Sequence, residues 1–553
     1  MLVLSRSLRA STALVTLALI LPAQNAHAQG PAGDAHVALD TLEVNAGTLT
    51  SGLNLTVPAP TGSRLNLTPL ETPASVQIIP GELARERGQY SVIEAVTQDA
   101  AGFSASPAPG NGGTSLSTRG FSGHGSVMQL YDGTRLYVGA GTVTFPFDTW
   151  SAERIEVLRG PASVLYGDGA IGGVVNVVPR KPDPHASHGE VYMALDSLMS
   201  GRVALDATGP INDRVSYRLD VAGKLSEGWV ERGDNSSLAV SAAIRVEVSD
   251  TLVLSLSNDY GFQQPQQYFG TPLITGRLSE VNRTQNYNID DAVVRYSDNW
   301  TQFKAEWTPS EAVTVRSTFY YLTSDRHWRN AESYVFQPAS GRVRRGDYLE
   351  ILHDQTQAGN RTDATYRASL FGMANELVVG FDVNQINFTH TNNSPYGGTS
   401  TVPLLDFNPG PFLSPVATVP KYHSDTMQYA IFAEDRLEVN DQWALVGGLR
   451  SENPTITRYN LVTGQEEFEK SYSALTGRIG VVYTPVKDLA FYASYTTGID
   501  PVGGLITLST ANSNFDLTTA EQYEAGVKAV FWEGRGEWTL AVYDITKYDL
   551  LAR

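Results

Sequence analysis

Glu153–Pro182 reads ERIEVLRGPASVLYGDGAIGGVVNVVPRKP, and this stretch decides the fold. Gly167, Gly169 and Gly172 have the spacing G-x-G-x-x-G, which in another protein indicates a loop that binds a dinucleotide. That function requires a helix directly after the glycines and an acidic residue about 20 positions further on. Four valines and two prolines follow instead, and they predict a short strand that ends before a helix can form. The glycines are therefore predicted to serve tight turns and close backbone approach in a small β-rich domain.

The surrounding region has the pattern of one mixed α/β domain. PASVQIIP, residues 73–80, predicts a strand, and residues 81–98 have helical spacing that Gly88 interrupts. VMQLYDGTRLYV, residues 127–138, predicts a hairpin with Asp132 and Gly133 at its turn.

From residue 186 to the last residue, apolar and polar residues alternate with a period of two, which predicts strands with two different faces. In VSYRLDVAGK, residues 215–224, valine, tyrosine and leucine occupy one face, and serine, arginine and aspartate occupy the other. Short connections such as GPINDR and EGRGE take turns with much longer ones, which is typical of an outer-membrane barrel. At about ten residues per membrane strand, this region holds roughly 15 strands.

The N-terminus has the features of a secretory signal peptide over residues 1–28. Arg6 and Arg9 supply positive charge, the apolar run that follows is too short to span a bilayer, and Ala26–Ala28 offers a small-residue cleavage site. Residues 29–70 lack a sustained period and are predicted to form a flexible leader.

One short segment of this leader, DTLEVNA, alternates like an isolated strand. One interpretation is chance alternation in a disordered tail. The other is a strand that pairs with the sheet edge of a partner protein by strand addition.

The composition excludes several classes of function. The formal net charge is −18, which argues against binding of nucleic acid across a basic face. The chain has no cysteine, so zinc–thiolate sites, iron–sulfur clusters and a cysteine nucleophile are excluded. His185 and His188 have the pattern of an exposed loop pair rather than of a metal site. No serine–histidine–aspartate or paired-carboxylate arrangement can be argued, so we expect no enzyme activity.

Together these motifs resemble the TonB-dependent outer-membrane receptors, most closely their ferric-siderophore branch. The Glu153–Pro182 stretch is similar to the family's plug signature, and TRGF (118–121) and YDGTRL (131–136) match further plug motifs. Ala520–Leu551 resembles a barrel segment that several more strands follow in the family. DTLEVNA lies where the family carries its TonB box, and the resemblance covers nearly the whole mature chain.

The resemblance implies an all-β transmembrane protein, an antiparallel outer-membrane β-barrel of about 22 strands with an N-terminal mixed α/β plug domain in its lumen. We expect a signal peptide at 1–28, a periplasmic leader with the TonB box at 29–70, the plug at 71–185, and an incomplete barrel at 186–553. Because an open sheet edge in lipid leaves backbone groups unpaired, a truncated, inactive relative is one interpretation.

The resemblance also implies a mechanism. A ferric siderophore binds outside the cell, TonB pairs with the box in the periplasm, and force from the proton-driven inner-membrane motor remodels the plug. The expected partners are TonB, the ferric siderophore and outer-membrane lipid of a Gram-negative bacterium, with no nucleic acid. Iron arrives already chelated, and no cofactor is permanently bound. The box residues are Asp40, Thr41, Leu42, Glu43, Val44, Asn45 and Ala46.

Aromatic and guanidinium groups suit a bulky, partly anionic metal chelate, so ligand contacts are expected at the plug tips and the long loops. The expected ligand-binding residues are Arg119, Tyr137, Phe145, Phe147, Trp150, Phe262, Tyr268, Phe269, Trp328 and Tyr334. Several of these aromatic residues are also compatible with an interfacial girdle or with packing among loops.

The plug motif is expected to be structural. Its residues are Glu153, Arg154, Glu156, Arg159, Gly160, Pro161, Tyr166, Gly167, Gly169, Gly172, Gly173 and Asn176. The four charged side chains of this set are expected to contribute polar contacts between plug and barrel wall, and the alternative for each is an ordinary solvated side chain.

Several alternatives stay open. The cargo of such a receptor includes haem, cobalamin or a sugar as well as a siderophore. A passive diffusion channel would need neither plug nor box, and an outer-membrane hydrolase would need a catalytic site that the sequence does not support. A signalling role is less expected, because only residues 29–39 precede the box.

Overall fold

The structure is a computed structural model, and it describes residues 49–108, 113–123, 125–137, 139, 144–197 and 199–550. The signal peptide expected at 1–28 and the TonB box expected at 40–46 lie outside these residues. The described residues belong to one compact unit.

The plug motif forms two antiparallel strands joined by one short helix and a glycine turn. Strand β7 (Ala152–Arg159) is followed by α4 (Ser163–Tyr166) and then by β8 (Gly173–Pro179). Gly167 and Gly169 have φ values of 84° and 86°, a conformation that favours glycine. A strand follows the glycines, so no helix N-terminus faces them, and the glycines lie in tight turns between elements of the plug.

The remaining plug elements follow the predicted pattern. The hairpin and the strand at 76–80 form as expected, and Gly88, with φ 68°, separates two helices. Ser91 and Glu94 form a capping box at the start of the second helix. A five-stranded sheet has the order β1-β7-β8-β5-β6, and β2, β3 and β4 form a second sheet. The bounds are β1 Val76–Pro80, α2 Gly81–Glu86, α3 Val92–Asp99, β2 Phe103–Ala108, β3 Gly113–Thr118, β4 Phe121–Ser122, β5 Val127–Tyr131 and β6 Thr134–Arg135.

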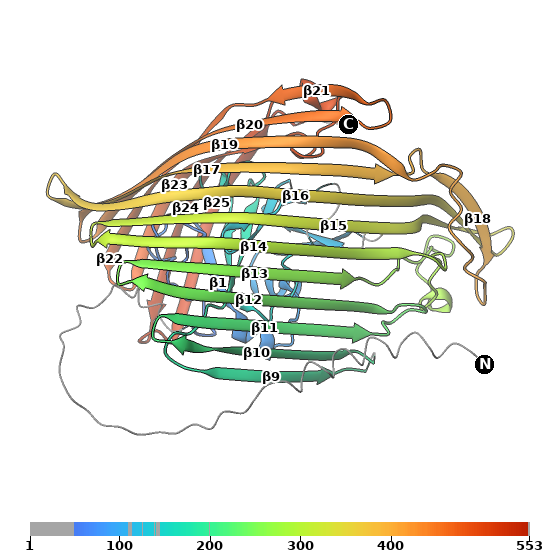
Figure 1. Ribbon diagram of the computed structural model, residues 1–553, viewed down its shortest axis with the longest axis horizontal. Helices are drawn as coiled ribbons and strands as arrows, with labels where there is room; N and C mark the ends of the chain where they lie inside the picture. Colours follow the sequence, from blue (N-terminus) through green and yellow to red (C-terminus); the bar gives the residue numbers. More distant parts are fainter. Residues whose placement is uncertain are drawn as a thin grey trace. The chain divides into compact units, whose positions relative to one another are not determined.

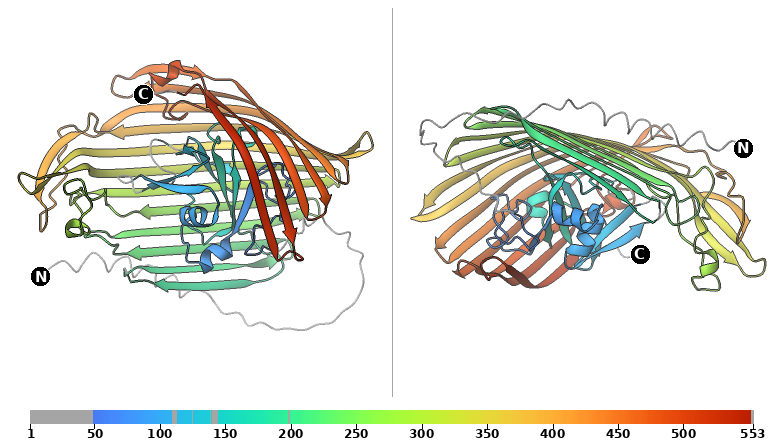
Figure 2. Two further views of the ribbon diagram at one scale, coloured as in Figure 1. Left: turned by 180° about the vertical axis from the view of Figure 1, so that it is seen from behind. Right: turned by 90° about the horizontal axis from the view of Figure 1, so that it is seen from below.

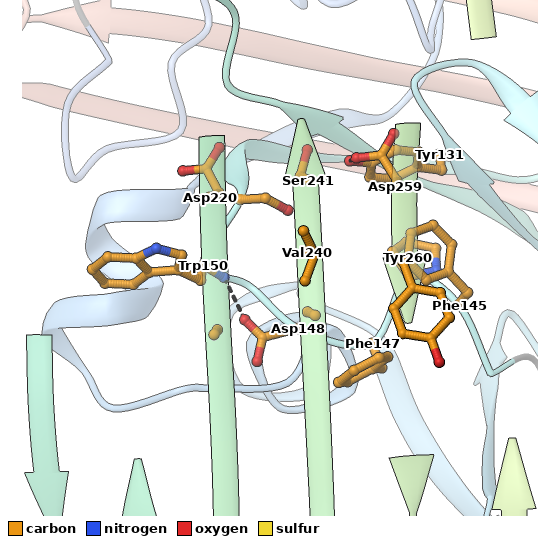
Figure 3. Close-up of a pocket in the computed structure, with 14 residues that line it drawn as sticks. Tyr131, Phe145, Phe147, Asp148, Trp150, Asp220, Val240, Ser241, Asp259 and Tyr260 are labelled. Carbon is orange, nitrogen blue, oxygen red and sulfur yellow. Dashed lines mark hydrogen bonds between the residues drawn. The ribbon is translucent and has the colours of Figure 1, made fainter. Parts of the chain in front are cut away.

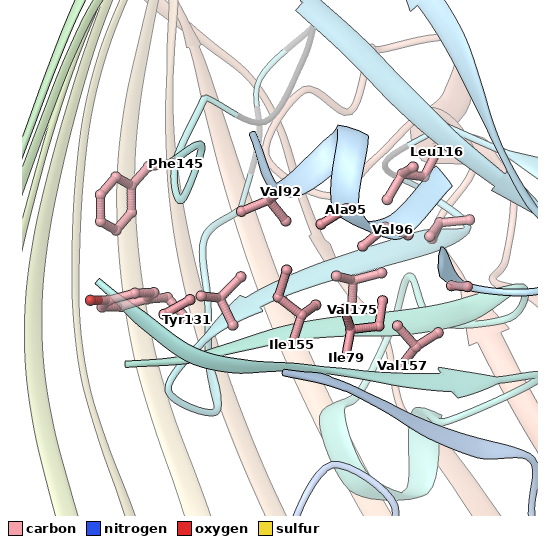
Figure 4. Close-up of a cluster of buried hydrophobic side chains, with 14 of the residues drawn as sticks. Ile79, Val92, Ala95, Val96, Leu116, Tyr131, Phe145, Ile155, Val157 and Val175 are labelled. Carbon is pink, nitrogen blue, oxygen red and sulfur yellow. The ribbon is translucent and has the colours of Figure 1, made fainter. Parts of the chain in front are cut away.

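Both faces of the five-stranded sheet are buried. On one face, Ile79, Ile155 and Val175 pack against α3, as Figure 4 shows. On the other face, Met128, Leu130, Leu158 and Val174 pack against α4 and against the chain that precedes β1. Continuous valine and isoleucine runs are typical of strands buried on both faces, and the short run in β8 is of this kind.

The barrel wall is an antiparallel sheet that curves around the plug (Figures 1 and 2). Its first strands are β9 His188–Leu195, β10 Gly201–Asn212, β11 Val215–Ser226, β12 Asn235–Ser249, β13 Leu252–Gln264, β14 Val293–Ser310, β15 Val313–Gln337 and β16 Arg342–Leu370. The others are β17 Met373–Asn392, β18 Gly397–Pro403, β19 Val419–Asn440, β20 Trp443–Asn460, β21 Gln465–Ser471, β22 Ala474–Val486, β23 Leu489–Asp500, β24 Thr518–Phe531 and β25 Gly536–Tyr548. Two 3-10 turns, η1 Glu280–Asn282 and η2 Asn512–Asn514, lie in long connections.

The strand count agrees with the prediction. The seven-residue strands β18 and β21 pair with β16 and β20 as extensions of long connections. When these two are set apart, 15 of the 17 strands β9–β25 in the described residues form the wall. The strand order is that of a barrel, with registers that run from β9–β10 to β24–β25. Among the described residues no register pairs β25 with β9.

The two faces of the wall have opposite character. In β11, Ser216, Arg218 and Asp220 are buried toward the plug, as the period-two pattern predicts. Large apolar side chains such as Ile431 and Ile479, with exposed fractions of 67% and 63%, lie on the outer face. In the described part of the chain, no helix has both the length and the apolar character that crossing a membrane requires.

The leader prediction is wrong for residues 53–70. Residues 53–74, which we call the strap, lie between the plug and the wall, and Leu55 and Ala59 are fully buried. Leu55 and Leu70 pack with Tyr492 of β23, while Val57 and Ala59 pack on the plug sheet. Apolar side chains at irregular intervals fill this gap, and they have no period that a sequence pattern could detect.

Replacement of Gly173 by alanine is expected to destabilise the plug. An added Cβ at Gly173 would lie 2.7 Å from the carbonyl oxygen of Leu158, whereas one at Gly125 would meet nothing within 4 Å. Overpacking of this kind costs about 1–3 kcal/mol. Thermal unfolding and protease cleavage within the plug, measured on purified Gly173→Ala and on the Gly125→Ala control, would test this. Equal stability of the two variants would contradict the expectation.

Candidate functional site in the barrel lumen

Buried ion pairs hold the plug against β10 and β11. Arg202 donates two hydrogen bonds to Asp148, at 2.7 and 2.9 Å. Arg180, which follows β8, contacts Asp206 and Asp220, each at 2.5 Å. Buried charges are costly unless they are paired, so these contacts define the position of the plug at this wall.

The hairpin between β5 and β6 makes a second set of contacts. Asp132 and Gly133 have φ values of 48° and 78°, as a type I′ turn requires. The Tyr131 hydroxyl donates to Oδ1 of Asp259 at 2.6 Å, and the Lys304 ammonium pairs with the Asp132 carboxylate. Burial raises the pKa of the Tyr131 hydroxyl, which therefore stays a donor. Burial opposes ionisation of Asp132, but the Lys304 ammonium outweighs it and lowers the pKa of that carboxyl.

A small cavity of about 20 Å³ lies beside this hairpin, with room for about one water molecule. Phe145, Phe147 and Trp150 line it from the plug, and Figure 3 shows them opposite Asp220 and Asp259. Phe145 packs against Tyr131 and Trp300, and Nε1 of Trp150 donates to the Leu205 carbonyl at 3.0 Å. These three aromatic residues were predicted to contact ligand, but here they fill the space between plug and wall.

Arg119 lies at the turn between β3 and β4. Arg119 and Gly120 have φ values of 53° and 83°, so TRGF forms a tight hairpin turn. The Arg119 guanidinium pairs with Glu524 at 2.6 Å and lies over the Tyr543 ring at 4.1 Å. Its side chain is 3% exposed, so the structure places this predicted ligand residue against the wall.

Two predicted ligand residues, Tyr137 and Trp328, belong to one aromatic cluster toward the long-loop end of the lumen, in which His353 and Phe388 lie between them. This lumen cluster also contains side chains from three further strands that the sequence analysis did not select. The ring centroids of His353 lie 5.0 Å from Trp328 and 4.9 Å from Phe388. The complete set is Tyr137, Trp328, His353, Phe388, His390 and Tyr422.

Polar groups connect the lumen cluster to the plug and to a neighbouring strand. The Tyr137 hydroxyl donates to Asp168 at 2.9 Å and accepts from Gln428 at 2.7 Å. The guanidinium of Arg458 lies 3.5 Å above the Tyr422 ring. Aromatic faces beside a cation suit a large, partly anionic ligand.

The other predicted aromatic residues are dispersed. Phe262 was predicted as a loop residue that contacts ligand, but it belongs to β13 and, by the alternation along that strand, lies on the outer face, opposite to Asp259 and Gly261. Tyr268 packs edge-on against Trp229, and Phe269 packs edge-on against Tyr334. These last contacts are packing among loops and the end of β15. Packing among loops was the alternative to ligand contact that the sequence left open for several aromatic residues.

The charged residues of the plug motif contact the plug and the strap. Arg154 pairs with Glu153 and Glu156, each at 2.7 Å. Glu156 accepts from the hydroxyl of Thr61 at 2.6 Å, and Arg159 donates to Gln77 at 2.6 Å. The prediction that these four side chains bridge plug and wall is wrong, because β7 lies inside the five-stranded sheet.

The strap is fixed to the wall through its backbone. Glu537 accepts from the N–H groups of Asn54 and Leu55 at 2.9 and 2.8 Å, and Glu434 accepts from the N–H of Arg64 at 3.0 Å. The buried Lys528 ammonium donates to the carbonyls of Pro69, Thr72 and Ala74 at 2.5, 2.6 and 2.8 Å. The lysine thus uses all three donors on one turn of the strap.

No metal centre accompanies these contacts in the part of the chain that the structure describes: no group of three or more His, Asp or Glu side chains is placed to hold an ion. His185 and His188 are exposed, as the sequence predicts. Sequence reasoning missed Lys528, Glu537, Glu434, His353 and His390. The available signal was their position on the lumen face of alternating strands, where a charged or imidazole side chain needs a partner.

Replacement of Lys528 by methionine is expected to loosen the strap. Three buried carbonyls lose their donor, and an unsatisfied buried group costs about 1–3 kcal/mol. Amide hydrogen exchange in residues 53–74 should accelerate by about 5- to 100-fold. Lys547→Met is the matched control, because Lys547 pairs at 2.6 Å with Asp500 within the barrel and does not reach the strap. Similar exchange in both variants would show that Lys528 does not hold the strap.

Comparison with known proteins shows which family models and relatives this chain matches. Residues 244–553 match the family model described as TonB dependent receptor-like, beta-barrel, and residues 68–174 match the TonB-dependent Receptor Plug Domain. The Ferrioxamine B receptor of Salmonella typhimurium strain LT2 is 25% identical over 528 residues, which cover 90% of this chain and 71% of that protein. The Ferric-pyoverdine 358 receptor of Pseudomonas putida is 24% identical over 560 residues, which cover 95% of this chain and 65% of that protein.

A solved structure supports the fold. The siderophore receptor PiuA from Acinetobacter baumannii superposes with a TM-score of 0.78 at 19% identity, over 89% of this chain and 75% of that one. The barrel model alone matches more than half of the 553 residues, and the plug model matches most of the inner domain. This chain belongs to the TonB-dependent receptor family.

Proposed function

We propose that this protein is an outer-membrane receptor that binds a ferric siderophore outside the cell and imports it into the periplasm with force from TonB. The proposal is supported by the family and by relatives named as ferrioxamine and ferric-pyoverdine receptors. The chain spans 65–71% of the length of those two relatives.

One observation carries the proposal: the plug lies within the wall and is tied to it by buried and half-buried ion pairs. Asp148 and Asp132 are paired with Arg202 and Lys304 of the barrel, and Arg180 reaches two barrel carboxylates. Removal of one partner of a buried ion pair destabilises the fold by about 3–5 kcal/mol, because the other charge stays buried without compensation. Cargo cannot pass until these contacts open, so an energy input fits this geometry better than passive diffusion does.

The lumen cluster is the candidate cargo surface. The Tyr137 hydroxyl links the cluster to Asp168 of the plug. The Arg458 guanidinium stacks over the Tyr422 ring. A ferric chelate bound against these rings would lie next to the plug. The other predicted ligand residues, apart from the outward Phe262, stay candidates that ligand-bound data would test.

The strap is the candidate route for force. It connects the expected TonB box at 40–46 to β1, so a pull on the box reaches the Glu537 contacts first and the Lys528 contacts last. Sequential release of hydrogen bonds needs less peak force than simultaneous rupture, because each step breaks few bonds. The strap would then detach from the wall before the plug sheet is disturbed.

Deletion of residues 40–46 is expected to abolish uptake of a ferric siderophore while surface binding stays intact. The deletion removes the strand with which TonB would pair and leaves the plug and the wall unchanged. Cells that express the variant would be tested with radiolabelled iron chelates for binding at low temperature and for accumulation at growth temperature.

A deletion of residues 31–37 has the same length and is the control, with normal accumulation expected. Accumulation that persists after deletion of 40–46 would favour a passive channel. Accumulation of haem, cobalamin or a sugar in place of iron chelates would reassign the cargo.

A further inference from the structure

We propose that Arg326, His353 and Tyr296 form an anion-binding site in the lumen, which takes a carboxylate or similar oxyanion of the cargo. The three residues lie on β14, β15 and β16 in one register row, with Tyr296 opposite Arg326 and Arg326 opposite His353. The inference rests on the proposed function, because it specifies the chemistry of the cargo that the lumen accepts.

A hydrogen-bond chain with a fixed direction ends at His353. Oδ1 of Asn392 accepts from the N–H of Ser394 at 3.0 Å, which leaves its Nδ2 to donate to Nε2 of His390 at 2.7 Å. His390 therefore carries its proton on Nδ1 and donates to Nε2 of His353, at 2.9 Å. The proton of neutral His353 is then fixed on Nδ1.

Among the described residues this Nδ1–H has no acceptor. His353 is 3% exposed, and no described atom forms a hydrogen bond with its Nδ1. Trp328 and Phe388 pack on the imidazole from two sides, so a donor there is held in apolar surroundings. A buried donor without an acceptor is costly, and a ligand oxygen would remove that cost.

A positive charge lies beside this donor. Arg326 is 4% exposed, and within the described residues its NH1 has no hydrogen-bond partner. No carboxylate of the described residues forms a direct ion pair with Arg326, and its contact with Asp298 runs through Thr144. The hydroxyl of Tyr296, the next residue in the row, is a third buried donor without a partner in the part of the chain that the structure describes. A cation with adjacent N–H and O–H donors is the arrangement that binds an oxyanion.

The same guanidinium also contacts the plug. NH2 of Arg326 donates to the hydroxyl of Thr144 at 3.2 Å, and that hydroxyl donates to Asp298 at 2.6 Å. A cargo oxyanion at NH1 and the plug residue at NH2 therefore share one side chain. Gly139 of the plug lies next to His353, because a Cβ added there would be 3.0 Å from Nδ1 of that imidazole.

Citrate binding to the full chain in detergent, measured by titration calorimetry at constant ionic strength, tests the site. We expect wild-type protein to bind citrate at or below about 1 mM. Arg326→Gln and His353→Phe should each weaken binding about tenfold or more, because each removes a buried donor to a charged group. Arg316→Gln, on the same strand but paired with Glu306, and His423→Phe are the matched controls.

The Asn392→Asp variant distinguishes the effect of the hydrogen-bond chain on citrate binding from the effect of side-chain packing. The shape is kept, but a carboxylate accepts from His390, which reverses both imidazoles and leaves an acceptor at Nδ1 of His353. Citrate binding should fall about tenfold or more, although Asp at 392 does not contact the site. Asn384→Asp adds the same charge to β17 without touching the chain, and it should bind citrate like the wild type.

Absence of citrate binding in the wild type would overturn the proposal, as would binding that survives Arg326→Gln, His353→Phe and Asn392→Asp. Iron uptake is a separate readout. Intact TonB-dependent uptake without anion binding would overturn the site and leave the proposed function standing. Citrate binding that depends on Arg326, in cells whose uptake ignores deletion of 40–46, would support the site and contradict the transport mechanism.

Discussion

The constraint on which the structure depends is the cost of burying charge in the lumen, which several side chains meet by pairing across the gap between plug and wall. Lumen-facing strands carry arginine, lysine, aspartate and glutamate, and water cannot reach most of them. Asp148 with Arg202, Asp132 with Lys304, and Glu524 with Arg119 each join one side chain of the plug to one of the barrel. Plug and wall are thereby aligned by charge, in addition to apolar contacts such as that of Phe145 with Trp300.

The architecture was predictable because two periods dominate the sequence. Period-two alternation from residue 186 onward gave strands with a polar inner face, and the spacing of short and long connections gave a barrel. The plug followed from turn chemistry, since Asp132–Gly133 and the glycines at 167 and 169 need φ values that few residues adopt. Alternation and turn formation depend on residues that are neighbours in the sequence, so both can be predicted from the sequence alone.

The site was predictable only in part, because its residues are far apart in sequence. Tyr137 and Trp328 were predicted as aromatic residues of the plug tip and the long loops, and both belong to the lumen cluster. His353, His390 and Arg326 come from strands whose registers no local pattern specifies. Phe145 and Trp150 were predicted on the same grounds, but their side chains pack against the wall. The strap was missed for a related reason: its apolar residues pack on two different partners and follow no period.

The grip of Lys528 on the strap involves only main-chain oxygens of Pro69, Thr72 and Ala74. Every amino acid supplies such an oxygen, so these hydrogen bonds depend on the backbone path of the strap and not on the identity of its side chains. Substitutions along this turn can then accumulate during evolution without weakening the attachment, provided that they keep the curvature. Because the acceptors are uncharged, added salt has little to screen, and the attachment should hold equally well in dilute and in saline surroundings.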